Sequence, residues 1–414
     1  MLRRLTATLL GLAIWGLAIW PGAAHALPMG SGASDPSIVI GMVATMTGPG
    51  ALAGQDAADG FNLALKQLGG RFSNQEVRIV LTDDKGSPDL ARQQVRRLME
   101  RERLDVVLTA VSSSSMAAIL PLMTEARLFV INLGNVPPAL SGAECSPFLF
   151  SLSPMPDGAH EAMGQYLASE RMRRVVVVGP DSPVTEAAVA AFKRTFPGEV
   201  SAVLAPKTGS TTFTAELDRI ARIKPDAIYS LLTGGMGGAF VRAWGGSPVK
   251  AEVPLFPAWQ AVERPLLPAM GDAAIDLVSV NSWGADLDSI PNRRLTADFE
   301  AEYGRPATTW AALGYDAVYL LDAALRETKG RTSDQDALRA ALRRADFVSV
   351  RGAMKFNTNH FPLTTYYVRK IIRDPKGRAT TEMRGVVLKD WRDRLAPTCP
   401  MRWVEEPLPP PVKK

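Results

Sequence analysis

The sequence predicts an α/β protein made of two lobes, each with a parallel sheet covered by helices. Short apolar runs rich in β-branched residues alternate with segments of helical periodicity along almost the whole chain. The alternation occurs as two successive series, and in each an apolar strand ends in a loop of small residues that opens a helix. Because parallel strands require crossover connections, this order predicts parallel sheets with right-handed crossovers.

The first series supplies the elements of one lobe. Its β-branched runs, bounded by turn residues, predict strands at 38–44, 77–82, 105–110 and 128–133. Helical periodicity between them predicts helices at 55–68, 88–101 and 116–126. In the first of these helices Phe61, Ala64, Leu65 and Leu68 fall on one face, which is the spacing of a helix packed on a sheet.

The second series and the remaining chain follow the same rules. Strands are predicted at 174–179, 199–204, 226–232 and 365–372, and helices at 186–195, 213–223, 239–244, 309–328 and 333–344. The glycines of 234–238 are interpreted as a turn, with close approach of the backbone to a ligand as the alternative. Trp310 is interpreted as a packing residue, with stacking on a ligand as the alternative. The proline-rich, charged segment 404–414 is predicted to be a disordered tail.

The first 26 residues have the order of a secretory signal peptide. Arg3 and Arg4 precede an apolar run of 12 residues, and Ala24 and Ala26 supply the small residues of a cleavage site. A membrane anchor is the alternative, but 12 residues span only about 18 Å of helix against a hydrocarbon core of roughly 30 Å. Cleavage after Ala26 and a periplasmic protein are therefore expected.

Composition excludes several classes of function. Hydrophobic residues make up 46% and charged residues 21%, which excludes wholesale disorder. The formal charge of 47 − 42 = +5 is small and scattered, so no nucleic-acid partner is expected. Three histidines and two cysteines leave little material for a zinc or iron site, and neither a metal nor a cofactor is predicted.

The two cysteines acquire a role if the chain is exported. Cys145 and Cys399 form an even pair in an oxidising compartment, where a disulfide is favoured. Two buried free thiols are the alternative. A bridge would tie the end of the chain to its middle and would mainly restrict the unfolded state.

One loop raises a dinucleotide-binding alternative. Gly48, Gly50 and Gly54 follow the first strand in a pattern close to a dinucleotide fingerprint, and Asp83 and Asp84 end the next strand. Pro49 stiffens the turn that a pyrophosphate would have to approach. An exported enzyme would also lack a nicotinamide pool, so this alternative is disfavoured.

The serine run 112–115 precedes a predicted helix. Its hydroxyls and backbone amides, together with the helix dipole, favour a carboxylate ligand, and simple N-capping is the alternative. A nucleophilic serine requires a base within reach. The chain contains no G-x-S-x-G, and its two histidines beyond the leader, His160 and His360, stand in surface-like contexts. Hydrolase chemistry is therefore not expected, and no catalytic residue is assigned.

Six features follow one another in a distinctive order: IVIGMVATMTGP from Ile38, Gly54, the pair Asp83-Asp84, the loop 112–115, YDAVY from Tyr315, and Gly352 followed by Phe356-Asn357. Together they resemble the branched-chain amino-acid-binding (Leu/Ile/Val-binding) family, the extracytoplasmic substrate-binding proteins of ABC importers. The similarity extends over nearly all of residues 37–375.

The resemblance implies the type I periplasmic binding protein fold. This fold has two Rossmann-like lobes joined by a three-strand hinge, here with crossings near Ser153, Val280 and Asn359. It implies a first lobe of residues 37–152 and 281–358, and a second of residues 153–280 and 359–398. The ligand is expected in the cleft between the lobes.

The carboxylate end of the family's site is partly kept in this sequence. Ser113 matches the serine that contacts the ligand carboxylate in amino-acid-binding members, with Ser114 in the same loop. Gly134 matches the next backbone contact, with Asn135 beside it, although Val136 stands where the family pattern has threonine.

The ammonium end of the site is lost. Trp259 matches the acid that pairs with the ligand ammonium, Ala53 matches the aromatic residue of the first loop, and Val184 and Thr233 match tyrosines of the second lobe. Burying an ammonium without an acid would cost several kcal/mol. The resemblance therefore implies a roomy, apolar pocket for an aromatic or other hydrophobic carboxylate.

The expected function is capture of a small molecule by a monomer that closes two lobes and docks on an inner-membrane ABC permease. A sensor with the same fold and a branched-chain amino-acid binder are the alternatives within the family. An exported enzyme is the alternative outside it, and the small number of histidines and cysteines argues against that alternative.

Overall fold

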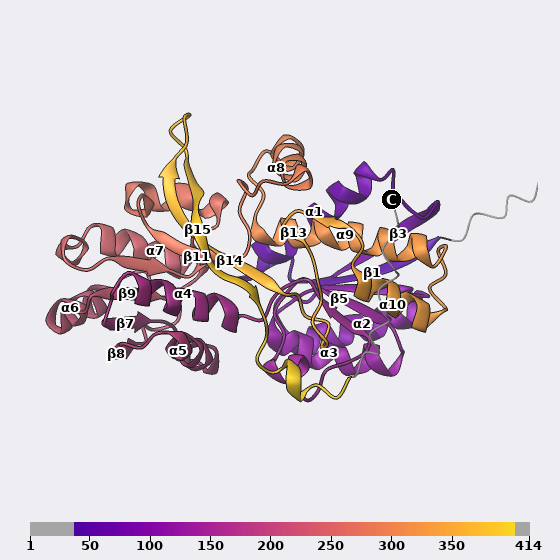
Figure 1. Cartoon of the computed structure of the whole chain (residues 1–414), viewed down its shortest axis with the longest axis horizontal. Coiled ribbons are helices and arrows are strands. Elements are labelled where there is room, and N and C mark those ends of the chain that lie inside the picture. The colour runs from indigo at the N-terminus through magenta and orange to yellow at the C-terminus, as the bar shows by residue number, and fades with distance from the viewer. Residues whose placement is uncertain (1–36, 402–414) are drawn as a thin grey trace, which may run out of the picture. The chain divides into compact units, whose positions relative to one another are not determined.

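The computed structural model describes residues 37–401 and is an α/β protein with two parallel sheets (Figure 1). The predicted leader, 1–26, and the predicted tail, 404–414, lie outside the described residues. We call the elements around the first parallel sheet lobe 1 and those around the second lobe 2. The predicted fold class is confirmed.

Lobe 1 contains a six-stranded sheet in the order β2-β3-β1-β4-β5-β6. All neighbouring strands are parallel except the short β2, which pairs with β3 in antiparallel fashion. Every residue of β1, β4 and β5 is buried, as expected for strands covered on both faces. The bounds are β1 Ile38–Ala44, β2 Arg71–Phe72, β3 Gln75–Asp83, β4 Val106–Ala110, β5 Phe129–Asn132 and β6 Leu149–Ser151.

The helices of lobe 1 come from two separate parts of the chain. They are α1 Ala51–Gln67, α2 Pro88–Arg101, α3 Ser113–Glu125, α8 Ile290–Tyr303, α9 Thr309–Glu327 and α10 Gln335–Arg344. Helices α1 and α9 pack backbone to backbone: a Cβ on Gly60 would lie 2.1 Å from the Ala311 carbonyl oxygen, and one on Gly314 would lie 2.0 Å from that of Ala57. Only glycine permits so close a crossing.

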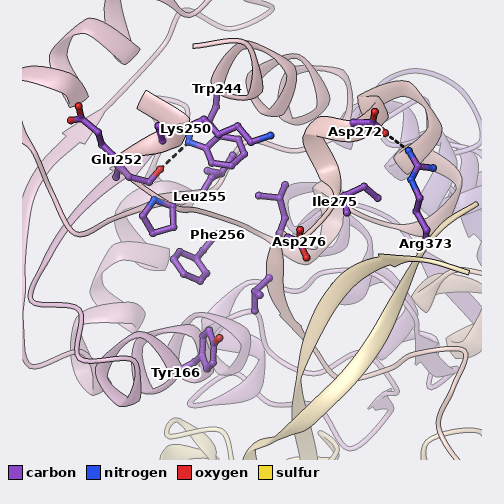
Figure 2. A pocket seen from close by; sticks show the side chains of 15 residues that line it. Tyr166, Trp244, Lys250, Glu252, Leu255, Phe256, Asp272, Ile275, Asp276 and Arg373 are labelled. Atoms are coloured by element: carbon purple, nitrogen blue, oxygen red, sulfur yellow. Dashed lines mark hydrogen bonds and ion pairs between the residues drawn. The ribbon is translucent and has the colours of Figure 1, made fainter. Parts of the chain in front are cut away.

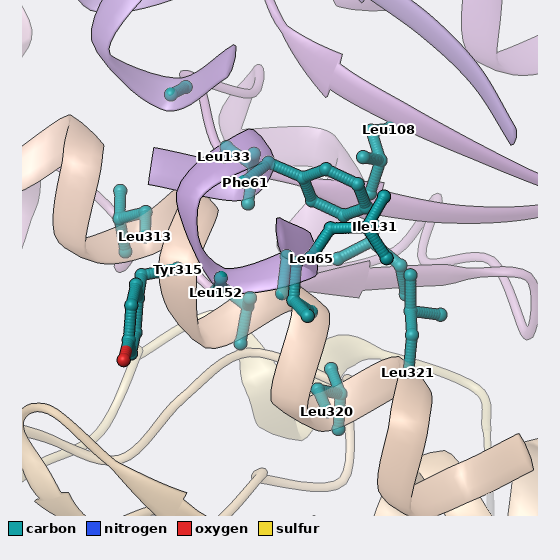
Figure 3. Packing of buried hydrophobic residues seen from close by; sticks show 14 of the residues in the cluster. Phe61, Leu65, Leu108, Ile131, Leu133, Leu152, Leu313, Tyr315, Leu320 and Leu321 are labelled. Carbon is teal, nitrogen blue, oxygen red and sulfur yellow. The ribbon is translucent and has the colours of Figure 1, made fainter. Parts of the chain in front are cut away.

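Apolar side chains from these helices fill the space against the sheet. Phe61 of α1 lies among Leu108 and Ile131 of the sheet and Leu321 of α9, all fully buried (Figure 3). Residues on one helical face therefore meet residues on one sheet face, as the periodicity predicts.

Lobe 2 contains a four-stranded parallel sheet in the order β10-β9-β7-β8. Its strands are β7 Arg174–Val178, β8 Glu199–Leu204, β9 Ala227–Ser230 and β10 Leu255–Pro257. Its helices are α4 Asp157–Ser169, α5 Pro183–Thr195, α6 Thr214–Ile223 and α7 Gly234–Gly245. Short 3₁₀ turns occur at η1 Pro138–Ser141, η2 Pro248–Ala251, η3 Trp259–Ala261, η4 Arg264–Ala274 and η5 Ala396–Thr398.

A third sheet is antiparallel and was only partly predicted. It joins β11 Val278–Asn281, β14 Thr364–Arg373 and β15 Ala379–Trp391, and the long hairpin of β14 and β15 is visible in Figure 1. Strand β15 was missed because most of its side chains are exposed or half-buried and its sequence mixes polar and apolar residues without a clear strand pattern. Two-residue strands β12 Val348–Ser349 and β13 Gly352–Ala353 form a separate ladder.

Four helices begin earlier than predicted. Helix α1 begins at Ala51 instead of 55, α3 at Ser113 instead of 116, α5 at Pro183 instead of 186, and α7 at Gly234 instead of 239. The first turns of α1, α3 and α7 consist mostly of small residues that carry no apolar periodicity, so the pattern starts about one turn late. The glycines of 234–238 are consequently the opening turn of α7, and not the turn expected from the sequence.

The predicted disulfide between Cys145 and Cys399 is present, with a Cα–Cα distance of 5.6 Å. The chain around Cys399 lies against lobe 1, because Asn359 donates through Nδ2 to the Ser141 carbonyl at 2.6 Å and to Asp393 at 3.2 Å. The predicted segment 359–398 contacts lobe 1 here and also contacts lobe 2, because Trp391 donates through Nε1 to Glu161 of α4 at 2.6 Å. The boundaries near Ser153, Val280 and Asn359 stay predictions.

Candidate functional site

The candidate site lies at the carboxyl ends of the parallel strands, where ligands of open α/β sheets bind. In lobe 1 the loops after β1, β4 and β5 meet at this edge, since the three strands are parallel neighbours. They carry Ala53 in the first turn of α1, Ser113 and Ser114 in the first turn of α3, and Gly134 and Asn135 after β5.

The residues of the serine loop differ in their roles: one caps α3, and the next two lie in its first turn. Ser112 is the N-cap of α3 and accepts from the Ser115 amide at 3.2 Å, and its hydroxyl lies 3.0 Å from that of Ser114. Ser113 is the first helical residue and is half-buried, and Ser114 is exposed. N-capping therefore explains Ser112 and leaves the Ser113 hydroxyl beside the positive end of the helix dipole.

Gly134 brings the loop after β5 against the serine loop. A Cβ at Gly134 would lie 2.4 Å from the Val111 carbonyl oxygen, and the Asn135 amide donates to the same oxygen at 3.2 Å. The Asn132 side chain supports this turn, donating to the Gly134 carbonyl at 3.0 Å. The structure therefore places Gly134 and Asn135 next to the residue that precedes Ser112.

Asp83 and Asp84, the acids considered for dinucleotide binding, accept hydrogen bonds from the loop between β1 and α1. Thr45 donates to Asp84 at 2.7 Å, Thr47 donates to Asp83 at 2.7 Å, and the Met46 amide donates to Asp83 at 2.9 Å. Both carboxylates thus hold the loop after β1, which presents the half-buried Ala53.

The lobe 2 residues line the equivalent edge of the second sheet. Val184 lies in the first turn of α5, Thr233 is the N-cap of α7, and Trp259 follows β10. Val184 is 74% exposed, Thr233 is exposed and Trp259 is half-buried. Each follows a different strand of the parallel set, so the topology places them along one edge.

Trp259 also contacts lobe 1. Its indole lies 5.2 Å, centroid to centroid, from that of Trp310, in the first turn of α9, with an interplanar angle of 47°. Helix α9 begins beside the first turns of α1, since Thr308 donates to Asp56 at 2.5 Å. Trp310 packs on Trp259 in this structure, and its interpretation as a packing residue stays a prediction.

Glu263 is a residue that the sequence analysis missed. It is 5% exposed, and its Oε1 accepts from the Thr309 amide at 3.1 Å, across the lobes. Burial raises the pKa of Glu263 to about 7; the contact with Thr309 and the charge of Arg264 act in the opposite direction, and Asp56 adds to the rise. Nothing in its local sequence marked it as buried.

The histidines are not in surface positions, so that expectation was wrong. His360 is fully buried and stacks on Phe150 with ring centroids 3.9 Å apart, and its Nδ1 lies 3.0 Å from the Leu149 carbonyl. His160 lies with Nδ1 2.6 Å from the Tyr229 hydroxyl. Burial lowers the pKa of His160 to about 4 and that of His360 to about 3. Both rings are packing residues that stay neutral near pH 7.

A surface hollow of about 770 Å³ lies elsewhere on lobe 2. It is bounded by Trp244, Phe256 and Tyr166, with Lys250 over the Trp244 ring and Arg373 paired with Asp272 (Figure 2). Its lining includes the chain that enters β10 and β11, so it opens at the amino ends of these strands, opposite the edge that carries Trp259.

Two other kinds of site are absent from residues 37–401. No group of three or more His, Cys, Asp or Glu side chains is arranged to hold a metal ion in this part of the chain. No helix in the described range has the length and apolarity needed to cross a membrane.

Comparison with known proteins gives the family. The chain matches the family described as Periplasmic binding protein over residues 37–377. The Leu/Ile/Val-binding protein homolog 6 of Brucella abortus (strain 2308) is 21% identical over 357 residues, covering 82% of this chain and 89% of the relative.

Two solved structures share the fold. A solute-binding protein of an ABC transporter from R. palustris, in complex with benzoate, has a TM-score of 0.80 and 24% identity, covering 88% of this chain and 100% of that chain. A solute-binding protein from Rhodopseudomonas palustris BisB5, in complex with 3,4-dihydroxy benzoic acid, has a TM-score of 0.79 and 24% identity, covering 86% and 99%. The predicted resemblance is thus confirmed, and the chain belongs to the branched-chain amino-acid-binding family of type I periplasmic binding proteins.

Proposed function

We propose that this protein captures an aromatic or similarly hydrophobic carboxylate between its lobes and delivers it to an ABC permease. The observation that carries the proposal is the pair Trp259 and Trp310, two half-buried indoles from opposite lobes at the ligand edge. An aromatic wall stands where family members that bind amino acids have an acid.

The carboxylate of the ligand is assigned to lobe 1. Ser113 presents a hydroxyl at the N-terminus of α3, and Gly134 and Asn135 lie beside the same loop. A helix N-terminus favours an anion, and hydrogen bonds to a charged group contribute about 1.5–3 kcal/mol each.

The ligand lacks an ammonium group in this proposal. Glu263 is the acid four residues beyond Trp259, and its Oε1 already accepts from the Thr309 amide. Burial also favours its neutral form, because it raises the pKa of Glu263 to about 7. A carboxyl group in this state is a poor counter-ion for a ligand ammonium.

Room for the ring comes from small or exposed residues. Ala53, Val184 and Thr233 have replaced larger family side chains, and Val184 is exposed along its edge. The two structural neighbours solved with benzoate and 3,4-dihydroxy benzoic acid support this class of ligand.

The proposal also includes the location of the protein, its oligomeric state and its partner. Cleavage after Ala26 releases the chain into the periplasm, where it acts as a monomer and docks on an inner-membrane permease. The sensor alternative differs only in the partner that receives the liganded protein.

Matched ligands test the proposal by isothermal titration calorimetry on the chain without its leader. Benzoate is compared with benzamide, which lacks the carboxylate charge, and 3-phenylpropionate with L-phenylalanine, which adds an ammonium. Benzoate and 3-phenylpropionate are expected to bind at least tenfold more tightly than their partners. Tighter binding of the amino acid would refute the absence of an ammonium site.

A branched-chain amino-acid ligand is the second candidate, because the Brucella relative carries the name of a Leu/Ile/Val-binding protein homolog. Leucine, isoleucine and valine are therefore included in the same titration. A leucine affinity above that of benzoate would favour this candidate.

A further inference from the structure

A groove of about 570 Å³ lies on lobe 1, beside the disulfide. Helix α3, the η1 turn and the segment that leads into β6 form its walls. Most of its lining is apolar, and three of the lining residues are prolines. The apolar lining includes Ala117, Leu120 and Pro121 of α3, Leu140 of η1, and Pro137 and Pro147.

The polar residues of this groove favour an apolar occupant that carries a positive charge next to it. The hydroxyl of Thr124 lies 3.2 Å from that of Ser146, which also accepts from the Phe148 amide at 3.2 Å, so both hydroxyls are already bonded within the protein. The two charged residues of the lining are Glu125 and Glu144, and both are exposed. An apolar floor with acids at its rim complements a large apolar side chain beside a cation.

The described part of the chain ends close to this groove. Cys145 lines the groove and is bridged to Cys399, with a Cα–Cα distance of 5.6 Å. The turn before Cys399 packs on the chain that follows η1, since a Cβ on Gly142 would lie 2.7 Å from the Thr398 hydroxyl oxygen. Met401, the last described residue, is only two positions beyond Cys399. The next residues therefore start within reach of the groove.

Arg402 and Trp403 come next in the sequence, outside the described residues. Trp403 is four positions beyond Cys399, and four residues of extended chain at about 3.3–3.6 Å each cover about 13–14 Å. An indole offers a larger apolar surface than most side chains, and Arg402 supplies the adjacent cation. Glu405 and Glu406 follow, and their charge matches that of the rim, so the complementary stretch ends before them.

We propose that the indole of Trp403 docks in this groove, with Arg402 next to the acids of the rim. A linker of a few residues gives a tethered group an effective concentration in the millimolar range, so the contact does not require a high intrinsic affinity. Docking would fasten the end of the chain to α3 one helical turn beyond Ser113, because Ala117 follows Ser113 by four positions. This intramolecular contact is independent of the proposed ligand, and each can fail without the other.

Fluorine NMR tests the docking on the chain without its leader, labelled with 5-fluorotryptophan. The resonance that Trp403→Phe removes belongs to Trp403, and the resonance that Trp244→Phe removes belongs to the buried Trp244. A soluble nitroxide is expected to broaden the Trp403 resonance as little as that of Trp244. Broadening equal to that of free 5-fluorotryptophan would overturn the proposal.

A variant of the groove tests where the indole docks. Ala117→Arg places a long charged side chain in the groove, at an exposed helical position that tolerates arginine, and should expose Trp403 to the nitroxide. Ala126→Arg is the matched control, because Ala126 is the exposed C-cap of the same helix and does not line the groove; it should leave Trp403 protected. Protection that survives Ala117→Arg would overturn the proposal. Protection that depends on protein concentration would show that a second copy supplies the indole, and would overturn it as well.

Thermal unfolding with the disulfide intact supplies a second readout. Trp403→Ala should lower the Tm by about 2 °C, because an apolar contact is lost. Leu408→Ala is the matched control, because Leu408 belongs to the predicted tail, and it should leave the Tm unchanged. In the Ala117→Arg background, Trp403→Ala should have no further effect. Equal Tm values for Trp403→Ala and Leu408→Ala would overturn the proposal.

Discussion

Glu263 allows a quantitative prediction about stability and pH. Replacing Glu263 with Gln removes the titrating group and keeps a side-chain oxygen that can accept from the Thr309 amide. The variant thus isolates the charge from the contact. Glu263 is 5% exposed, so its burial is the main cause of the effect.

The magnitude follows from the change in pKa on folding. The pKa of Glu263 is about 7 in the folded protein, against the ordinary glutamate value of 4.5 in the unfolded chain. Between these values the folded protein holds a proton that the unfolded chain has lost, so the free energy of unfolding falls as the pH rises. At about 1.4 kcal/mol per unit, a difference of 7 − 4.5 = 2.5 units corresponds to about 3 kcal/mol.

Urea denaturation with the disulfide intact measures this contribution. The unfolding free energy of Glu263→Gln minus that of the unmodified chain should increase by about 3 kcal/mol from pH 4.5 to pH 7.5. His160 and His360 act in the opposite direction, losing stability as the pH falls below 6.5, but they are present in both proteins and cancel.

The control is Glu252→Gln, which removes an exposed glutamate of lobe 2. The difference in unfolding free energy between Glu252→Gln and the unmodified chain should stay constant from pH 4.5 to pH 7.5. If the Glu263→Gln difference is also constant, the argument from burial is refuted.

Three further predictions concern the ligand edge and the disulfide. Ser113→Ala should weaken benzoate binding by about 1–3 kcal/mol in calorimetry, whereas Ser114→Ala, one residue further and exposed, should change it little; equal effects would remove Ser113 from the site. Trp310→Leu should weaken benzoate binding by about 1 kcal/mol through loss of an aromatic contact, and an unchanged Kd would place Trp310 outside the cleft. Reduction of Cys145–Cys399, separated by 254 residues, should lower the unfolding free energy by about 5 kcal/mol in urea, and identical midpoints with and without reductant would contradict this.

The sequence predicted the parts of the fold in which periodicity and burial coincide. Strand β1 and helix α2 match their predicted bounds, because each is delimited by turn or capping residues. Strand β15 was not predicted, because most of its side chains are exposed or half-buried and its mixed sequence carries no clear apolar alternation. Burial alone does not make a strand predictable, because the fully buried strands β6 and β10 span only three residues each and were also missed.

Some residues of the candidate site could be predicted from the sequence and others could not. Ser113 and Gly134 could be identified because each follows a buried strand in an order that the family shares. Glu263 and Trp310 could not be identified, because their positions depend on contacts across the lobes between residues 46 and 51 positions apart. Such contacts depend on tertiary packing and leave no local pattern.

The bridge between Cys145 and Cys399 has a consequence for how this protein matures. In the exported chain that we propose, Cys145 emerges early and Cys399 near the end, and all of the lobe 2 sheet is encoded between them. Oxidation must therefore wait until almost the whole polypeptide has crossed the membrane. Because the sequence contains no third cysteine, the bridge cannot form in a wrong pairing within one chain, and maturation requires an oxidant but no disulfide isomerase.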